Sequence, residues 1–174
     1  MTKDKLNFEK VSYEQFRNSM IEILPDENTI RKAYESIKLP ARGTNGSAGY
    51  DFYSPFSFLL SYGNNIIIPT GIRSHMPLDV VLCIFPRSGQ GFKTGISLAN
   101  TVGIIDSDYY YSDNEGHIMI KISNNNSTIK KDLTVEKGQA FCQGIFLPYL
   151  ITSDDTTNTV RNGGFGSTDQ WLLF

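Results

Sequence analysis

The sequence predicts an all-β domain, folded as an antiparallel sandwich or barrel, that follows a short helical segment. Three observations support this prediction. The hydrophobic period changes from helical to alternating after Pro40, the apolar runs beyond it are short, and Gly, Pro, Asn and Asp turns separate them without crossover helices. With 174 residues, of which 40% are hydrophobic, the chain has the size and composition of one globular domain.

The first helix is expected to begin after Ser12 and to end before Pro25. Gln15 lies at the spacing of a capping box from Ser12. One face of this helix would carry Tyr13, Phe16 and Met20.

A second helix is expected from Glu27 to Ile37. Asp26 or Asn28 can serve as its N-cap, and Pro40 terminates the helical pattern. Its apolar face would carry Ile30, Tyr34 and Ile37.

Eight short strands are expected in the rest of the chain, each bounded by turn residues. They are Tyr50–Tyr53, Phe56–Ser61, Asn65–Pro69, Val80–Phe85, Gly95–Ala99, Gly103–Ile105, Ile118–Ser123 and Phe141–Tyr149.

The chain is therefore expected to have three parts. Residues 1–38 form a helical N-terminal extension, residues 39–152 form the β domain, and residues 153–174 form a flexible tail. The tail is rich in Thr, Asp, Asn and Gly, a composition that cannot pack a core of its own, so we expect it to be mobile in the absence of a ligand.

Composition excludes several classes of protein. A net charge of −2 and a pI near 5.7, without a Lys or Arg cluster, argue against a nucleic-acid partner. The longest apolar runs, such as residues 80–85, are far shorter than the roughly 18 residues of a membrane span, and residues 1–5 open no signal peptide. Cys83 and Cys142 lie in apolar runs and are expected to be buried free thiols. We expect a soluble cytoplasmic protein.

Three segments combine glycine with polar side chains at expected strand ends, where a β domain can bring backbone N–H groups to a ligand. They are residues 86–91, 100–109 and 161–168. In the first, Arg87 supplies a guanidinium and Ser88 a hydroxyl, which suit phosphate oxygens, with a polar turn as the alternative.

The other two segments have their own chemistry. Asp106 follows Ile104 and Ile105, so its carboxylate would end an apolar strand, either as a general base toward water or as a solvated turn residue. In the third segment Arg161 and hydroxyl groups could close over a triphosphate while Phe165 stacks on a planar base. A disordered tail is the alternative for this segment.

Five short motifs, taken in order, resemble those of the trimeric dUTP pyrophosphatase family. They are residues 46–51 (Gly-Ser-Ala-Gly-Tyr-Asp), 86–89 (Pro-Arg-Ser-Gly), 100–109 (from Asn to Tyr), 138–143 (Gly-Gln-Ala-Phe-Cys-Gln) and 163–168 (Gly-Gly-Phe-Gly-Ser-Thr). Any one of them is a weak signal, but five in sequence are not expected by chance.

This resemblance implies a jelly-roll, β-barrel-like subunit and a homotrimer whose active sites lie between subunits. It also implies hydrolysis of dUTP to dUMP and pyrophosphate with Mg²⁺, which removes dUTP and supplies dUMP for dTMP synthesis. Phosphoryl transfer needs mainly positioned charge and one base for water, so the motifs suit this chemistry.

The resemblance assigns roles to individual residues. Asp106 matches the family base that deprotonates the attacking water, and Tyr109 would pack under the deoxyribose. The uracil would be bound by Asn100 and by backbone groups near Ile104, Ile105 and Met119. The phosphate chain would be bound by Arg87, Ser88, Gly89 and Gln143. Asp51 would hold Mg²⁺ through water only, and the lid over the substrate would carry Arg161, Phe165, Gly166, Ser167 and Thr168.

Some residues depart from the family pattern. Residues 110–115 occupy a place where common members have one residue; we expect a solvated loop, with a rim contact to substrate or to a neighbouring subunit as the alternative. Ala140 replaces a usual arginine, and the spacing from Arg161 to Phe165 is one residue shorter than usual. His75 and His117 are expected to be surface or strand residues.

Two other functions are compatible with the motifs. A dCTP deaminase of the same fold is the first, although such enzymes lack the lid motif found at residues 163–168. A regulatory module that binds a protein partner through this fold is the second, and it could coexist with catalysis.

Overall fold

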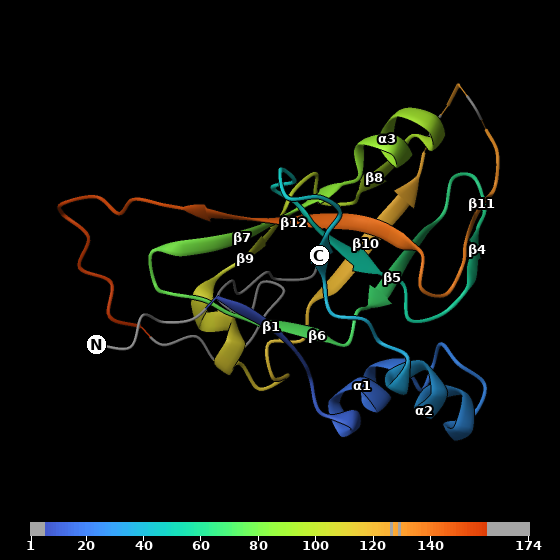
Figure 1. The fold of residues 1–174 in the computed structure, drawn as a ribbon, viewed down its shortest axis with the longest axis horizontal. Coiled ribbons are helices and arrows are strands. Elements are labelled where there is room, and N and C mark those ends of the chain that lie inside the picture. Colours follow the sequence, from blue (N-terminus) through green and yellow to red (C-terminus); the bar gives the residue numbers. More distant parts are fainter. Residues whose placement is uncertain (1–5, 126, 129, 160–174) are drawn as a thin grey trace, which may run out of the picture.

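The structure is a computed structural model that describes residues 6–125, 127–128 and 130–159 (Figure 1). Its helices are α1 (Tyr13–Met20), α2 (Glu27–Glu35), α3 (Ser88–Thr94) and the 3₁₀ helix η1 (Ser107–Tyr111). Its strands are β1 (Asn7–Lys10), β2 (Ala41–Arg42), β3 (Tyr50–Tyr53), β4 (Phe58–Leu60), β5 (Asn65–Pro69), β6 (Ile72–His75), β7 (Val80–Pro86), β8 (Ile96–Leu98), β9 (Gly103–Ile105), β10 (Met119–Asn124), β11 (Leu133–Val135) and β12 (Ala140–Pro148).

The strands form antiparallel sheets. The order in the largest sheet is β2-β3-β12-β7-β9, and the smaller sheets are β5-β10-β8, β11-β4 and β1-β6. Figure 1 shows the long strand β12, in orange, crossing the middle of the molecule, with α1 and α2, in blue, on the opposite side from α3. The predicted all-β class is confirmed.

A single apolar core joins the sheets to the N-terminal helices. Its largest fully buried side chains include Phe16, Phe52, Phe141, Met20, Ile68 and Leu82. Burying such side chains stabilises the folded state by roughly 1.5–3 kcal/mol each. The core thus combines residues of the expected N-terminal extension (1–38) with residues of the expected β domain (39–152).

The N-terminal helices begin as the sequence predicted. Ser12 caps α1 by accepting a hydrogen bond from the backbone N–H of Gln15, and Asp26 caps α2 by accepting one from Thr29. The reciprocal half of the expected capping box does not form in α1, because the Ser12 N–H donates to a carboxylate oxygen of Glu115 at 2.7 Å. Glu115, which is distant in sequence, thus takes the place of Gln15 as the partner of the Ser12 N–H.

The sequence did not predict strand β1. Its residues Asn7–Lys10 pair antiparallel with β6, and Phe8 packs its ring against Tyr50, Phe52 and Phe146. All four residues of β1 are only half buried, so they show no alternation that sequence reading could detect. The N-terminal segment is consequently part of a sheet as well as helical.

Other elements also differ from the expectation. Residues 88–94, which overlap the segment 86–91 for which a polar turn was the alternative, form the short helix α3, and β2, β6 and β11 were not anticipated. The ends of the other eight strands lie within two residues of the predicted ranges. Cys83 and Cys142 are free and buried, as expected, and burial raises the pKa of both thiols.

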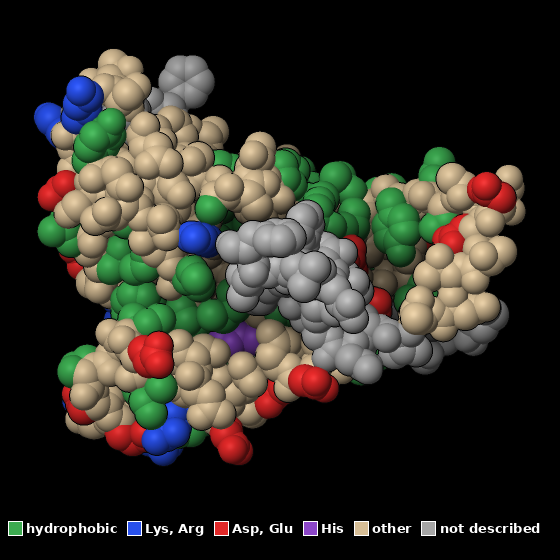
Figure 2. All heavy atoms as spheres, turned by 180° about the vertical axis from the view of Figure 1, so that it is seen from behind, with side chains coloured by type: hydrophobic (Ala, Val, Ile, Leu, Met, Phe, Trp, Pro, Cys, Tyr) green, Lys and Arg blue, Asp and Glu red, His purple; other side chains and the backbone are tan. Residues whose placement is uncertain are grey.

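The described helices are all too short or too polar to cross a membrane. The face shown in Figure 2 carries scattered Lys and Arg side chains with Asp and Glu among them. This distribution agrees with the net charge of −2.

Candidate functional site

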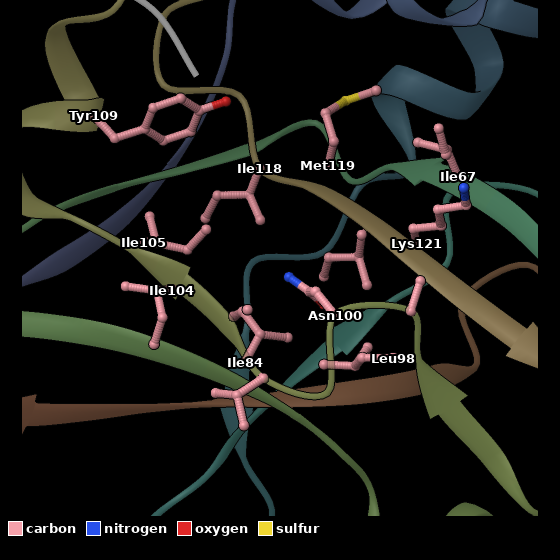
Figure 3. Close-up of a pocket in the computed structure, with 14 residues that line it drawn as sticks. Ile67, Ile84, Leu98, Asn100, Ile104, Ile105, Tyr109, Ile118, Met119 and Lys121 are labelled. Carbon is pink, nitrogen blue, oxygen red and sulfur yellow. The ribbon is translucent and has the colours of Figure 1, made fainter. Parts of the chain in front are cut away.

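An apolar cavity of about 650 Å³ lies between the β8 to β9 connection and strand β10 (Figure 3). It is lined by Ile67, Ile84, Leu98, Ala99, Asn100, Val102, Gly103, Ile104, Ile105, Tyr109, Ile118, Met119, Ile120 and Lys121. Figure 3 shows Tyr109 near one end, Lys121 near the other, and Asn100 between them. The structure therefore brings together five residues predicted from sequence, namely Asn100, Ile104, Ile105, Tyr109 and Met119.

The walls of this cavity follow from strand pairing. Strand β9 pairs with β7, which places Ile104 opposite Cys83, and β10 pairs with both β5 and β8. Gly103 faces Ile84, and a Cβ atom there would lie 3.1 Å from the Ile84 Cβ. Glycine at this position lets the two strands approach closely.

Tyr109 is held at the cavity by two hydrogen bonds. Its hydroxyl donates to the backbone oxygen of His117 at 2.9 Å and accepts from the side-chain Nδ2 of Asn114 at 2.7 Å. The residue is only 6% exposed. A flat, fixed ring of this kind can support a ring-shaped ligand and limit its shape.

Asp106 lies between the cavity-lining strand β9 and the helix η1. Its backbone oxygen accepts from the N–H of Tyr109 at 3.2 Å, and its side chain makes no capping hydrogen bond to η1. The residue is half buried. The carboxylate thus follows the apolar strand, as the sequence predicted.

A second, polar cavity of about 540 Å³ contains other predicted residues. It is lined by Gly43, Ser47, Gly49, Asp51, Arg87, Ser88, Gly89, Gln139 and Gln143. Strand β12 brings them together, because Gln143 pairs with Asp51 of β3 on one side and with Phe85 of β7 on the other. Three of the sequence motifs therefore meet at one place in the fold.

The polar cavity contains an ion pair. The Nε of Arg87 lies 2.9 Å from a carboxylate oxygen of Asp51, and Gln143 donates to the backbone oxygen of Pro86 at 3.1 Å. A Cβ atom on Gly49 would lie 2.4 Å from the Gln143 side-chain oxygen, so the glycine leaves the space that Gln143 occupies. Guanidinium, amide and hydroxyl groups here can bind a chain of oxyanions.

The two cavities share no lining residue. The base-binding and phosphate-binding residues predicted from sequence thus lie in separate cavities of one chain. Five predicted residues, Arg161, Phe165, Gly166, Ser167 and Thr168, lie outside the described residues.

The expectation of a solvated loop at residues 110–115 holds only for Tyr111 and Asp113, which are exposed, and is wrong for the other four residues. Tyr110 donates to a carboxylate oxygen of Glu9 at 2.8 Å, and its ring stacks under the guanidinium of Arg73. Glu115 accepts hydrogen bonds from the backbone and the hydroxyl of Ser12 at 2.7 and 2.6 Å. Burial raises the pKa of the Glu115 carboxyl, but the hydrogen bonds from Ser12, together with the nearby charge of Arg73, leave the pKa lowered. We call residues 110–115 the insertion.

His117 is fully buried and precedes strand β10, which corrects the expectation of a surface or strand residue. Its Nε2 accepts from the backbone N–H of Gly71 at 2.8 Å, and its Nδ1 lies 3.2 Å from the Ser19 hydroxyl. Burial lowers its pKa to about 4. Sequence reasoning missed these roles of Asn114, Glu115 and His117; the unusual length of the insertion was a signal for the first two.

Comparison with known protein families identifies a match over most of the chain. The family model described as dUTPase matches residues 35–169. Similar curated proteins include the deoxyuridine 5'-triphosphate nucleotidohydrolase of Lactococcus lactis, which is 38% identical over 76% of this chain and 88% of the relative. The protein of the same name from Sodalis glossinidius is 37% identical over 78% of this chain and 90% of the relative.

Solved structures agree with the sequence comparison. A dUTPase from Streptococcus mutans is similar with a TM-score of 0.62 and 33% identity, covering 84% of this chain and 98% of that one. A mutant dUTPase from phage phi11 of S. aureus, described as coordinating a structural Mg(II) ion, has a TM-score of 0.62 at 18% identity, covering 90% of this chain and 98% of that one. Because its identity is only 18%, the phage phi11 protein supports the fold alone.

Proposed function

The chain belongs to the dUTPase family, and from this premise we propose that it hydrolyses dUTP to dUMP and pyrophosphate. The observation that supports this function best is the apolar cavity under Tyr109, which adjoins the strand that leads to Asp106. The cavity volume of about 650 Å³ is in the range of small-ligand sites.

In this proposal, the apolar cavity binds deoxyuridine. Asn100, which reaches the middle of the cavity in Figure 3, pairs with the uracil edge, together with backbone groups near Ile104 and Met119. Tyr109 packs under the deoxyribose and leaves no room for a 2′-hydroxyl. Apolar walls on both sides of a planar base exclude water and strengthen these polar contacts.

Asp106 acts as the general base in the proposed reaction. Its carboxylate takes a proton from a water molecule as that water attacks the α-phosphorus, and the bond from this phosphorus to the bridging oxygen breaks to release pyrophosphate. A positioned base of this kind contributes roughly 10²–10⁴-fold to a rate.

The polar cavity binds the triphosphate. Arg87 supplies positive charge, while Ser88, Gly89 and Gln143 supply hydroxyl, backbone and amide groups to phosphate oxygens. In the structure Arg87 is paired with Asp51, so the guanidinium is already oriented into this cavity. Arg161, Phe165, Gly166, Ser167 and Thr168 are proposed to close over the substrate as a lid.

The donor groups in the polar cavity fit Mg²⁺ bound together with the substrate. Asp51 lines this cavity beside the proposed phosphate ligands, and among the described residues no cluster of three metal-binding side chains occurs. Mg²⁺ commonly keeps several waters and takes phosphate oxygens as ligands, so one carboxylate can hold it through water. When bound, Mg²⁺ neutralises charge on the phosphates.

We propose a homotrimer in which each active site combines the apolar cavity of one subunit with the polar cavity of another. The support is the separation of these cavities, which have no lining residue in common. We also place the enzyme in the cytoplasm, where it removes dUTP and supplies dUMP for dTMP synthesis.

The experiment that tests the function is a panel of dUTP, dCTP, UTP and dTTP with Mg²⁺, scored for both pyrophosphate and ammonia. We expect pyrophosphate from dUTP and little from the others. Ammonia from dCTP would instead identify a deaminase of the same fold. Failure to turn over any nucleotide would leave the regulatory module as the better explanation of the chain.

A further inference from the structure

The insertion contacts a residue that lines the apolar cavity. Asn114 lies within it, and its Nδ2 donates to the hydroxyl of Tyr109 at 2.7 Å. Neither Asn114 nor any other insertion residue lines the cavity. Any effect of Asn114 on the cavity must therefore be transmitted through Tyr109.

The direction of each hydrogen bond in this contact is determined by its neighbours. The N–H of Gly116 donates to the Oδ1 of Asn114 at 3.2 Å, which turns Nδ2 toward Tyr109. The Tyr109 hydroxyl donates to the backbone oxygen of His117 at 2.9 Å and thus accepts from Asn114. Three bonds in series therefore hold the outer end of the Tyr109 ring.

The insertion itself is anchored to the N-terminal segment. Glu115, next to Asn114, accepts two hydrogen bonds from Ser12, and Tyr110 donates to Glu9 of strand β1. At the end of the insertion Gly116 has φ of +67°, and a Cβ atom there would lie 2.7 Å from the Tyr110 Cα. The loop is thus held at both ends, which gives Asn114 a fixed position.

We infer that Asn114 is a positioning residue for substrate selection: it holds the Tyr109 ring against the cavity and thereby helps to exclude nucleotides that carry a 2′-hydroxyl. This inference rests on the proposed function, because it assumes that Tyr109 faces the sugar. The physical reason is that a ring with its hydroxyl bound at two points cannot tilt to make room, whereas a ring bound at one point can.

The test compares Asn114→Ala, Tyr109→Phe and the double variant with the wild-type protein. Tyr109→Phe removes the same hydroxyl without altering the insertion, so the inference can still be tested if Asn114→Ala folds poorly. Asp113→Ala is the matched control, because Asp113 is exposed and lies beside Asn114. Calorimetry measures the Kd of dUMP and of UMP, and steady-state assays measure kcat and KM for dUTP and UTP.

For Asn114→Ala we expect dUMP to bind about three- to tenfold more weakly, the scale of one neutral hydrogen bond. UMP binding should change less, so the preference for dUMP falls, and KM should rise more than kcat drops. The double variant should be no worse than Tyr109→Phe, and Asp113→Ala should match the wild type. An unchanged dUMP preference in folded Asn114→Ala, or additive losses in the double variant, would overturn the inference.

A measurement on the free protein separates this inference from the proposed function. The NMR ring signals of Tyr109, identified by their disappearance in Tyr109→Phe, should show faster ring flipping in Asn114→Ala than in wild type. Unchanged ring motion would count against Asn114 as a positioning residue even in an active enzyme. A wild-type protein that neither binds dUMP nor hydrolyses dUTP would instead refute the function, whatever the ring does.

Discussion

The buried ring of His117 lies against Ser19 of helix α1, with 3.2 Å between Nδ1 and the serine hydroxyl. The Ser19 hydroxyl in turn donates to the backbone oxygen of Gln15 at 3.1 Å. Because Nε2 accepts from the N–H of Gly71, the proton of the neutral ring is on Nδ1 and is donated to Ser19. The neutral imidazole thus satisfies both of its nitrogens and links the N-terminal helix to the β domain.

This arrangement predicts acid sensitivity. Burial lowers the pKa of His117 to about 4 from an ordinary 6.5, with Glu115 as the charged group that opposes this shift. Between these values the unfolded chain binds a proton that the folded chain does not, so the free energy of unfolding falls as pH falls through this window. The full loss is about 3 kcal/mol and is complete below the folded-state pKa; it fades as the pH rises past 6.5.

Urea unfolding of wild type and His117→Gln at fixed protein concentration, measured from pH 7.5 to 5, tests this expectation. The variant should be less stable at pH 7.5 but should depend less on pH. His75→Gln, which removes the other of the two histidines, serves as the comparison variant. If the free energy of unfolding depended equally on pH in wild type and in His117→Gln, His117 would be excluded as the cause of the acid sensitivity.

Asp106→Asn should retain nucleotide binding while kcat falls at least about 100-fold, because it removes the proposed base without changing side-chain size. Pyrophosphate release measures kcat, and calorimetry with dUMP measures binding. Asp113→Asn removes an exposed carboxylate from a nearby segment and should have wild-type kcat. Asp106 would lose its assigned role if its variant turned over dUTP normally.

Mixing two inactive variants should restore activity if active sites are shared between subunits. One parent is Asp106→Asn, which affects the apolar side, and the other is Arg87→Ala, which affects the polar side. Verified mixed trimers contain sites built from an intact Asp106 of one subunit and an intact Arg87 of another, so pyrophosphate release should reappear. Mixed trimers as inactive as both parents would mean that each chain forms its own site.

Tyr109→Ala should narrow the gap in kcat/KM between dUTP and UTP more than the gap between dUTP and dCTP. The ring is proposed to face the sugar, whereas cytosine is rejected by unsatisfied polar groups at roughly 1–3 kcal/mol each. Steady-state kinetics on the three nucleotides measures both gaps. Equal narrowing would show that the ring shapes the whole cavity, and efficient UTP hydrolysis by the wild type would remove the sugar argument.

Gly71→Ala should destabilise the protein far more than Gly63→Ala. Both glycines have positive φ, +71° and +85°, but a Cβ at Gly71 would lie 2.3 Å from the Ile37 Cδ1, whereas none of the described atoms lies within 4 Å of one at Gly63. We expect a loss of about 1 kcal/mol at Gly63 from backbone strain and about 2–4 kcal/mol at Gly71 from strain plus overpacking. Thermal unfolding measures both losses, and similar losses would contradict close packing of Ile37 and Phe16 on this turn.

The sequence by itself determined the local secondary-structure elements and the types of functional side chain that the motifs carry. The N-caps at Ser12 and Asp26 and the main strands follow from spacing and turn residues, which act over a few neighbouring positions. The motif residues likewise indicated a base, a sugar-facing ring and phosphate ligands before any fold was known. Their roles remain predictions, but the structure groups them into two cavities.

Only the tertiary structure decided which distant residues meet. Strand β1 forms because β6 offers a free edge, Glu115 takes the Ser12 N–H that Gln15 was expected to bind, and His117 is buried because α1 covers it. Hydrophobic period and turn composition report only on neighbours along the chain, so they carry no information about these pairings. The physical reason is that a polar group such as the Ser12 N–H needs one partner, and the fold determines which of the possible partners comes within reach.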